Sequence, residues 1–121
     1  MKKQQATAYF GGGEVQIALF LYIEENIQVC YAPELDLYGY GTAETEALAS
    51  FAVVLDNYLG YVMAQNTLDT DLKALGWRVN TKTRTYTAPP LHQLLVQNAD
   101  FAAILQKRPF RKLDRLVPLA A

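Results

Sequence analysis

The chain has 121 residues, of which 51% are hydrophobic and 19% charged, and this composition excludes a disordered polymer. Its length fits one domain, so we predict a flexible arm over residues 1–13 and a single domain over residues 14–121. The single cysteine excludes an internal disulfide and fits a reducing cytoplasm. No uninterrupted apolar run reaches about 18 residues and no apolar segment follows the N-terminal lysines, so we expect neither a membrane-spanning helix nor a signal peptide.

The net charge of −1 conceals two halves of opposite sign. Residues 4–72 contain ten acids and no Lys or Arg, whereas residues 73–121 contain nine bases and two acids. Two interpretations remain open. Either the halves pack on each other and neutralise their fields, or the acidic half presents a surface to a basic partner, since complementary potentials steer association.

The first part of the domain predicts three antiparallel strands. Apolar residues alternate over residues 15–23, and the residues between them are also partly apolar, so the second face of this strand is predicted to be partly apolar too. A turn at residues 24–26 leads to a second strand over residues 27–31, which Pro33 ends because it cannot donate to a ladder. A short third strand is expected around residues 37–40.

A long helix is predicted from about residue 43 to residue 65. Its main apolar stripe repeats every three or four residues: Leu48, Phe51, Leu55, either Tyr58 or Leu59, and Val62. Further apolar residues lie off this stripe: Val53, Val54, Tyr61 and Met63. With the two-faced first strand, they predict a homodimer or larger assembly, because exposed apolar patches usually mark contacts. Gly60 interrupts the helix and is expected to allow a close contact.

The C-terminal half predicts shorter elements. These are a helix ended by Gly76, a hairpin over residues 77–87, a helix opened by Pro90, a helix capped by Asn98 and a final strand over residues 110–119. The whole pattern predicts an α+β fold, in which an antiparallel sheet carries one long packed helix and the C-terminal hairpin and short helices are added around it.

No recognisable set of catalytic, cofactor-binding or metal-binding residues accompanies these elements, so we expect a non-enzymatic domain without a cofactor. His92 is the only histidine and Cys30 lies in mid-strand among apolar neighbours. A small metal-dependent hydrolase remains a lesser alternative, with Glu34, Asp36 and Asp56 as the carboxylates, but no spacing makes these three converge.

Two short motifs connect the strands to the long helix. Residues 33–35, Pro-Glu-Leu, form a turn, and Gly41, Glu46 and Ala47 open the helix. Glycine permits a sharp turn, and Glu46 can accept a hydrogen bond from the backbone at the cap. In this order the motifs resemble those of the HicB antitoxin family, over roughly residues 15–65. The threonine of the family pattern is replaced by Ala43, so capping passes to Thr42 or is lost.

The resemblance implies an incomplete ribonuclease-H-like α+β domain that neutralises a small, basic, RNA-cleaving toxin. Members of the family usually continue into a ribbon-helix-helix or helix-turn-helix domain. Residues 76–121 resemble neither, so specific DNA binding is not expected.

Two sets of side chains are therefore candidates for contact with a partner. The first set would meet a basic protein: Glu24, Glu25, Glu34, Asp36, Glu44 and Glu46. The second set would contact phosphates if the chain were instead a nucleic-acid-binding module: Lys107, Arg108, Arg111, Lys112 and Arg115.

Overall fold

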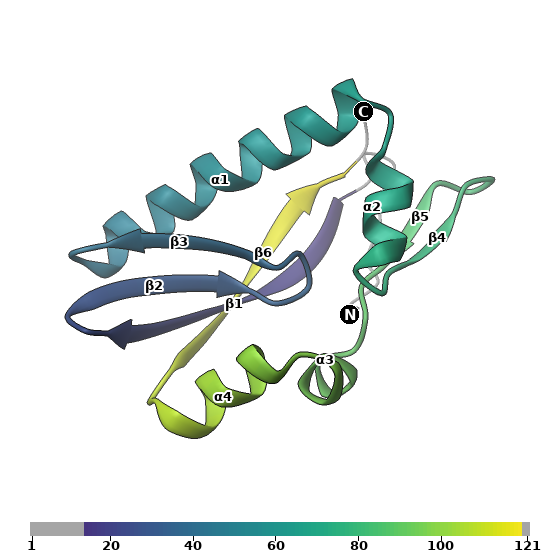
Figure 1. Ribbon diagram of the computed structural model, residues 1–121. Helices are drawn as coiled ribbons and strands as arrows, with labels where there is room; N and C mark the ends of the chain where they lie inside the picture. Colours follow the sequence, from purple (N-terminus) through teal and green to yellow (C-terminus); the bar gives the residue numbers. More distant parts are fainter. Residues whose placement is uncertain (1–13, 120–121) are drawn as a thin grey trace, which may run out of the picture.

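The computed structural model describes residues 14–119, so the predicted arm over residues 1–13 lies outside the described residues. The elements follow in the order β1 (Glu14–Glu24), β2 (Ile27–Ala32), β3 (Leu37–Gly41), α1 (Glu44–Ala64), α2 (Leu68–Ala74), β4 (Arg78–Asn80), β5 (Thr85–Thr87), α3 (Leu91–Gln97), α4 (Ala99–Lys107) and β6 (Arg111–Pro118) (Figure 1). The predicted α+β class is confirmed, with the long helix packed on an antiparallel sheet.

The main sheet has the strand order β3-β2-β1-β6, and all three pairings are antiparallel. A two-residue turn joins β1 to β2, and both of its residues, Glu25 and Asn26, have positive φ angles of 50° and 67°. Such a turn matches the right-handed twist of the flanking strands, which explains the tight hairpin. β6 returns from the C-terminal half and pairs with the other side of β1, so that β3 and β6 form the two edges.

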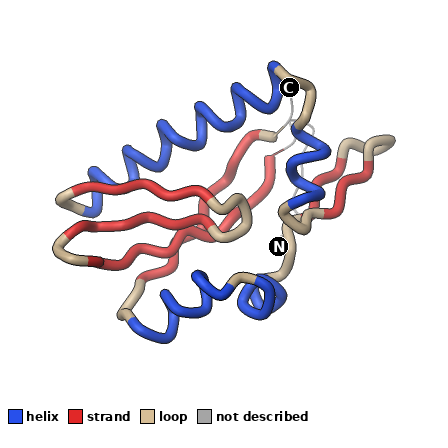
Figure 2. The backbone as a smooth tube through the Cα atoms, in the orientation of Figure 1, coloured by secondary structure: helices blue, strands red, loops and turns tan. Residues whose placement is uncertain are grey.

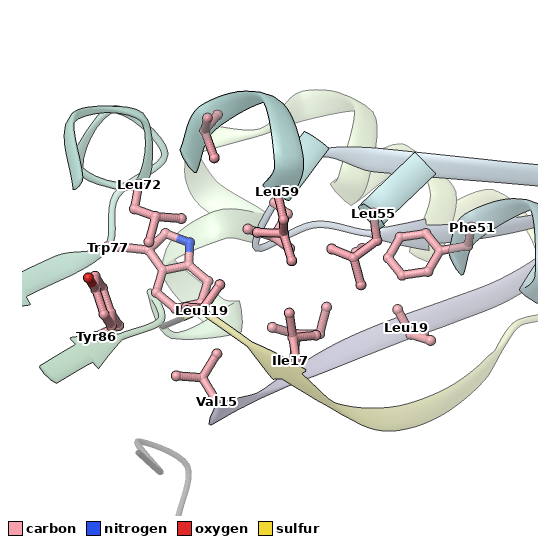
Figure 3. Packing of buried hydrophobic residues seen from close by; sticks show 14 of the residues in the cluster. Val15, Ile17, Leu19, Phe51, Leu55, Leu59, Leu72, Trp77, Tyr86 and Leu119 are labelled. Carbon is pink, nitrogen blue, oxygen red and sulfur yellow. The ribbon is translucent and has the colours of Figure 1, made fainter. Parts of the chain in front are cut away.

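Helix α1 covers one face of this sheet. Its buried residues Phe51, Leu55 and Leu59 point toward Ile17 and Leu19 of β1 (Figure 3). The predicted main stripe of the long helix is therefore the core face. Beyond the end of α1, the same core continues to three buried residues of the α2 and β4–β5 region, namely Leu72, Trp77 and Tyr86.

Helices α3 and α4 cover the opposite face, so the sheet lies between two helical layers (Figure 2). Phe20 of β1 meets Phe101 of α4 edge to face, with 5.1 Å between the ring centroids. This second core also contains Ala18, Tyr22 and other buried residues of the two central strands. The second apolar face of β1 is thus covered within the chain, which corrects the expectation that it would require another copy.

The contact between β3 and α1 is too close for side chains at two glycines. A Cβ atom on Gly39 would lie 2.4 Å from the backbone nitrogen of Phe51, and one on Gly41 would lie 2.4 Å from Cβ of Glu46. Gly60 behaves in the opposite way, because it is exposed and an added Cβ would meet no atom within 4 Å. The expectation of a close contact at Gly60 was wrong, and the close approach occurs at the strand glycines instead.

The outer side of α1 carries Val53 and Tyr61, both of which are exposed. By length and composition alone, α1 is apolar enough to cross a membrane, contrary to the expectation drawn from uninterrupted apolar runs. A core helix passes the same test, and the packing of α1 on the sheet accounts for most of its apolar stripe.

Candidate partner-binding groove

The six acidic candidates do not form one surface. Glu24 and Glu25 at the β1–β2 turn lie at the same end of the sheet as Glu44 and Glu46 at the start of α1, because Gln28 of β2 pairs with Gly41 of β3. The remaining two lie in the β2–β3 turn, at the opposite end of those strands: Glu34 and Asp36. A single basic partner would therefore meet four of these residues at one end or two at the other.

Ion pairs join the acidic half to the basic half. Arg108 Nη2 lies 3.1 Å from Glu24 Oε2, and Arg111 pairs with Glu44 across the gap between β6 and α1. Within β6, Lys112 Nζ lies 2.8 Å from Asp114 Oδ1. The first two contacts support mutual neutralisation of the two halves, although exposed pairs of this kind each stabilise the fold only slightly.

Glu34 lies below the surface, with an exposed fraction of 6%. Its Oε1 accepts a hydrogen bond of 2.7 Å from the backbone N–H of Ala18, and its carbonyl accepts one of 2.7 Å from Trp77 Nε1. β2 ends just before Pro33 and gives Ala18 no backbone acceptor, so the Glu34 carboxylate accepts the hydrogen bond from the Ala18 N–H instead. Glu34 is thus a structural group, and in this arrangement it offers no surface to a partner.

Burial raises the pKa of Glu34 to about 7, partly opposed by the Ala18 hydrogen bond and by Lys112 and partly assisted by Asp114. An acid whose pKa is raised by folding binds its proton more tightly in the folded state, so stability falls as pH rises between the unfolded and folded pKa values. We expect the free energy of unfolding to fall by about 1–3 kcal/mol between about pH 4.5 and pH 7.

Urea denaturation across this pH range measures the effect, and Glu34→Gln is the matched variant. Glutamine can still accept from Ala18 but does not titrate, so the slope should largely disappear. An unchanged slope in Glu34→Gln would assign the pH dependence to other groups.

Asp36 also has a structural partner. Its Oδ1 accepts a hydrogen bond of 2.8 Å from the Tyr31 hydroxyl, which in turn accepts one of 2.9 Å from Asn98 Nδ2. Asn98 Oδ1 accepts from the N–H of Phe101 at 3.0 Å, which confirms its predicted role as the cap of α4. This chain of hydrogen bonds ties the β2–β3 turn to the corner between α3 and α4.

A groove of about 350 Å³ runs between the sheet and α4. Three tyrosines from β1 and β3 form its aromatic side, and α4 supplies the other wall together with charged residues at the rim. Its lining comprises Tyr22, Glu24, Tyr38, Tyr40, Asp100, Ala103, Ile104, Lys107 and Arg108. Glu24, Lys107 and Arg108 come from the two predicted sets, so the fold brings members of both to one place.

The tyrosines are held in a defined arrangement. The rings of Tyr38 and Tyr40 are nearly parallel, at 2° and 6.1 Å between centroids, and Tyr38 stacks on the buried Tyr31 at 4.3 Å. The guanidinium of Arg108 lies 5.9 Å from the centre of the Tyr22 ring, within reach of a cation–π interaction. Arg108 therefore contacts both the carboxylate of Glu24 and the ring of Tyr22.

The groove carries side chains that can bind a partner through hydrogen bonds. Tyrosine hydroxyls are neutral at pH 7 and can donate hydrogen bonds, and burial raises the pKa of both Tyr22 and Tyr38 further from this pH. Cys30 is fully buried, and burial raises the pKa of its thiol to about 11, whereas His92 is exposed on α3. Over residues 14–119, no three His, Cys, Asp or Glu side chains converge as metal ligands would, so Glu34, Asp36 and Asp56 are not brought together.

Sequence reasoning did not single out the tyrosines. The alternation of Tyr38 and Tyr40 around Gly39 was a signal that both rings lie on the same face of β3. Their pairing with Tyr22 across the sheet required the register of the strands, which places Val29 between Tyr22 and Tyr40.

Comparison of the chain with protein-family models, with curated proteins and with solved structures gave no match. The resemblance to HicB antitoxins therefore rests on its short motifs alone.

Proposed function

We propose that this chain is a non-enzymatic protein-binding domain and that the tyrosine groove is its contact surface. The observation that carries the proposal is the exposure of Tyr40, 54% of which is accessible although its ring is stacked on that of Tyr38. A rigid, exposed aromatic side chain adds a large contact area at little cost in conformational entropy. Tyrosine and arginine are the residue types that most often dominate binding energy at protein interfaces.

The surroundings of Tyr40 support the same function. Ile27 is 39% exposed and lies on the same sheet face as Val29, which is flanked by Tyr22 and Tyr40. Ile27 thus adds an exposed apolar side chain to this face at the first residue of β2. Carboxylates and bases line the groove beside the tyrosines, and protein interfaces are enriched in tyrosine and arginine.

For the partner we propose a small basic protein of the kind that HicB-like antitoxins neutralise. Two observations at the helix entry support this finer proposal. Ala43 is the N-cap residue and makes no side-chain cap hydrogen bond, so side-chain capping is lost at this position. Glu46 Oε1 instead accepts a hydrogen bond of 2.7 Å from the backbone N–H of Thr42 and one of 2.6 Å from its hydroxyl. Gly41 lies against Glu46 where a side chain would not fit. The motif residues that carry the resemblance thus have definite structural roles.

Tyr40→Ala is expected to weaken binding of such a partner about tenfold to thirtyfold, the effect of removing an interface hot spot of roughly 1.4–2 kcal/mol. The probe is the product of any small basic reading frame that adjoins this gene, with any RNA-cleaving activity removed by mutation. Isothermal titration calorimetry at about 0.15 M salt measures the dissociation constant, and the Debye length of about 8 Å under these conditions suppresses purely long-range attraction.

Tyr61→Ala is the matched control, because Tyr61 is 65% exposed and lies on α1, across the sheet from the groove. It should bind like the unmodified chain. Equal losses in both variants, or no binding at all by the unmodified chain, would contradict the proposal.

The nucleic-acid alternative has weaker support. Arg108, Arg111 and Lys112 each pair with a carboxylate of the chain, which reduces the positive charge they can offer to phosphates. A second arm of the experiment uses duplex RNA and duplex DNA at the same salt concentration, where we expect no complex. A micromolar complex that is lost in the double variant Arg111→Ala, Arg115→Ala would favour the nucleic-acid reading.

A further inference from the structure

β6 is an edge strand whose outer backbone groups have no partner among the described residues. The sheet order ends at β6, and no backbone hydrogen bond from a described loop or cap reaches residues 111–118. A free edge of this length presents a row of N–H and C=O groups to which another strand can be added.

The direction of these groups follows from the contact at Glu34. The N–H of Ala18 points toward the β2 side, because the Glu34 carboxylate accepts from it. Ala18 is opposite Asp114 in the β1–β6 register, so this pair is not hydrogen-bonded and the backbone of Asp114 points away from β1. By the two-residue period, the backbone groups of Lys112 and Leu116 also point outward.

The side chains along this edge are complementary to those of a second, antiparallel copy of the same strand. On the sheet face that packs against α3 and α4, the strand and the residue before it carry Phe110, Lys112, Asp114 and Leu116 at alternate positions. An antiparallel copy centred on Leu113 sets each Lys112 opposite an Asp114 and each Phe110 opposite a Leu116. Phe110 and Leu116 are 44% and 51% exposed, so this register would cover two large apolar side chains on each chain.

We propose that a second copy of this chain adds to the free edge of β6, antiparallel and symmetric about Leu113, to form one continuous sheet. Symmetric registers centred on Lys112, Asp114 or Arg115 lack both Lys112–Asp114 contacts. A centre at Lys112, Asp114 or Arg115 places that charged residue opposite itself, and like charges directly opposite are destabilising.

Basic side chains on an edge often prevent pairing, and two bases of β6 also need an explanation. In the proposed register Arg111 faces Arg115 of the second copy, on the α1 side of the sheet. Arg111 is already paired with Glu44 of its own chain, which reduces the repulsion. The edge charges therefore favour the register centred on Leu113 over those centred on Lys112, Asp114 or Arg115.

A charge exchange tests the register. Lys112→Glu and Asp114→Lys each turn two attractive cross-strand contacts into repulsive ones, so each should raise the dimer dissociation constant about tenfold or more. The double variant Lys112→Glu, Asp114→Lys restores opposite charges both within the strand and between copies, and should dimerise like the unmodified chain. Sedimentation velocity over a concentration series measures the constant, and circular dichroism verifies that each variant is folded.

Cross-linking provides a second readout. In a Cys30→Ala background, Leu113→Cys should form a disulfide between copies, since Cα atoms of a non-hydrogen-bonded antiparallel pair lie about 4.5 Å apart, within disulfide reach. Leu116→Cys is the control, because its opposite residue is Phe110 and its own copy lies several residues away. A crosslink at both positions would indicate random collision.

Several outcomes would overturn the proposal. One is a species of 13.5 kDa, the mass of one chain, at several hundred micromolar protein. Another is a dimer that is unaffected by either charge variant and forms no Leu113→Cys crosslink. A dimer that is lost only in Val53→Lys would move the interface to the outer side of α1, where Val53 is exposed.

Discussion

Phe51→Ala is expected to lower the free energy of unfolding by about 3–5 kcal/mol, the range for truncating a buried aromatic side chain. Phe51 is fully buried and lies between α1 and the sheet, where it points toward Leu19 (Figure 3). Its loss would leave a cavity in the larger core, and the β3 backbone already lies against α1 at Gly39, so it has little room to move into that cavity.

Val53→Ala serves as the control for Phe51→Ala, because Val53 lies on the same helix and is exposed. Its effect should stay within about 0.5 kcal/mol. Chemical denaturation of both variants gives the comparison. A loss of less than about 1 kcal/mol at Phe51, well below the range for a buried aromatic, would mean that α1 uses another face in its core.

Gly39→Ala is expected to cost about 3 kcal/mol or more, at or above the upper end of the range for overpacking. The new methyl group would lie 2.4 Å from the Phe51 nitrogen and 2.6 Å from the Ala47 carbonyl oxygen, so the backbone of α1 would have to move. A flexible side chain can turn aside, whereas a helix backbone shifts only with the residues that it packs. The variant should therefore lose stability and weaken the seating of α1 on β3.

The same substitution at Gly60 should have the opposite sign. Gly60 lies in the interior of α1, where alanine is preferred over glycine by about 1 kcal/mol, and an added Cβ meets nothing within 4 Å. Thermal melts of the two variants beside the unmodified chain separate the two effects. If Gly39→Ala were neutral, β3 would not be held against α1 as closely as the structure indicates.

The fold gives the charge asymmetry of the sequence a structural meaning. β6 and the end of α4 bring basic residues back to the acidic N-terminal part, where Arg108 meets Glu24 and Arg111 meets Glu44. The six acidic residues proposed from the sequence thus do not form one surface. The most buried of them, Glu34, holds the end of β2 against β1. The proposed recognition surface moves to the groove, where residues of both signs surround three tyrosines.

The secondary structure of this chain could be predicted from local sequence patterns alone. The alternation of β1, the stripe of α1 and the cap at Asn98 depend on neighbours within a few residues, so their physical causes can be read without a fold. The apolar character of both faces of β1 was also visible in the sequence, and an apolar strand face must be covered by some layer.

Only the tertiary structure decided which layer covers the second apolar face of β1. α3 and α4 bury the second face of β1 within the chain, and this depends on where the segment after β5 crosses the sheet. The register of β1 with β2 and of β2 with β3 likewise brought Tyr22 and Tyr40 to either side of Val29. Contacts between residues far apart in the chain depend on strand order and register, and local periodicity does not contain that information.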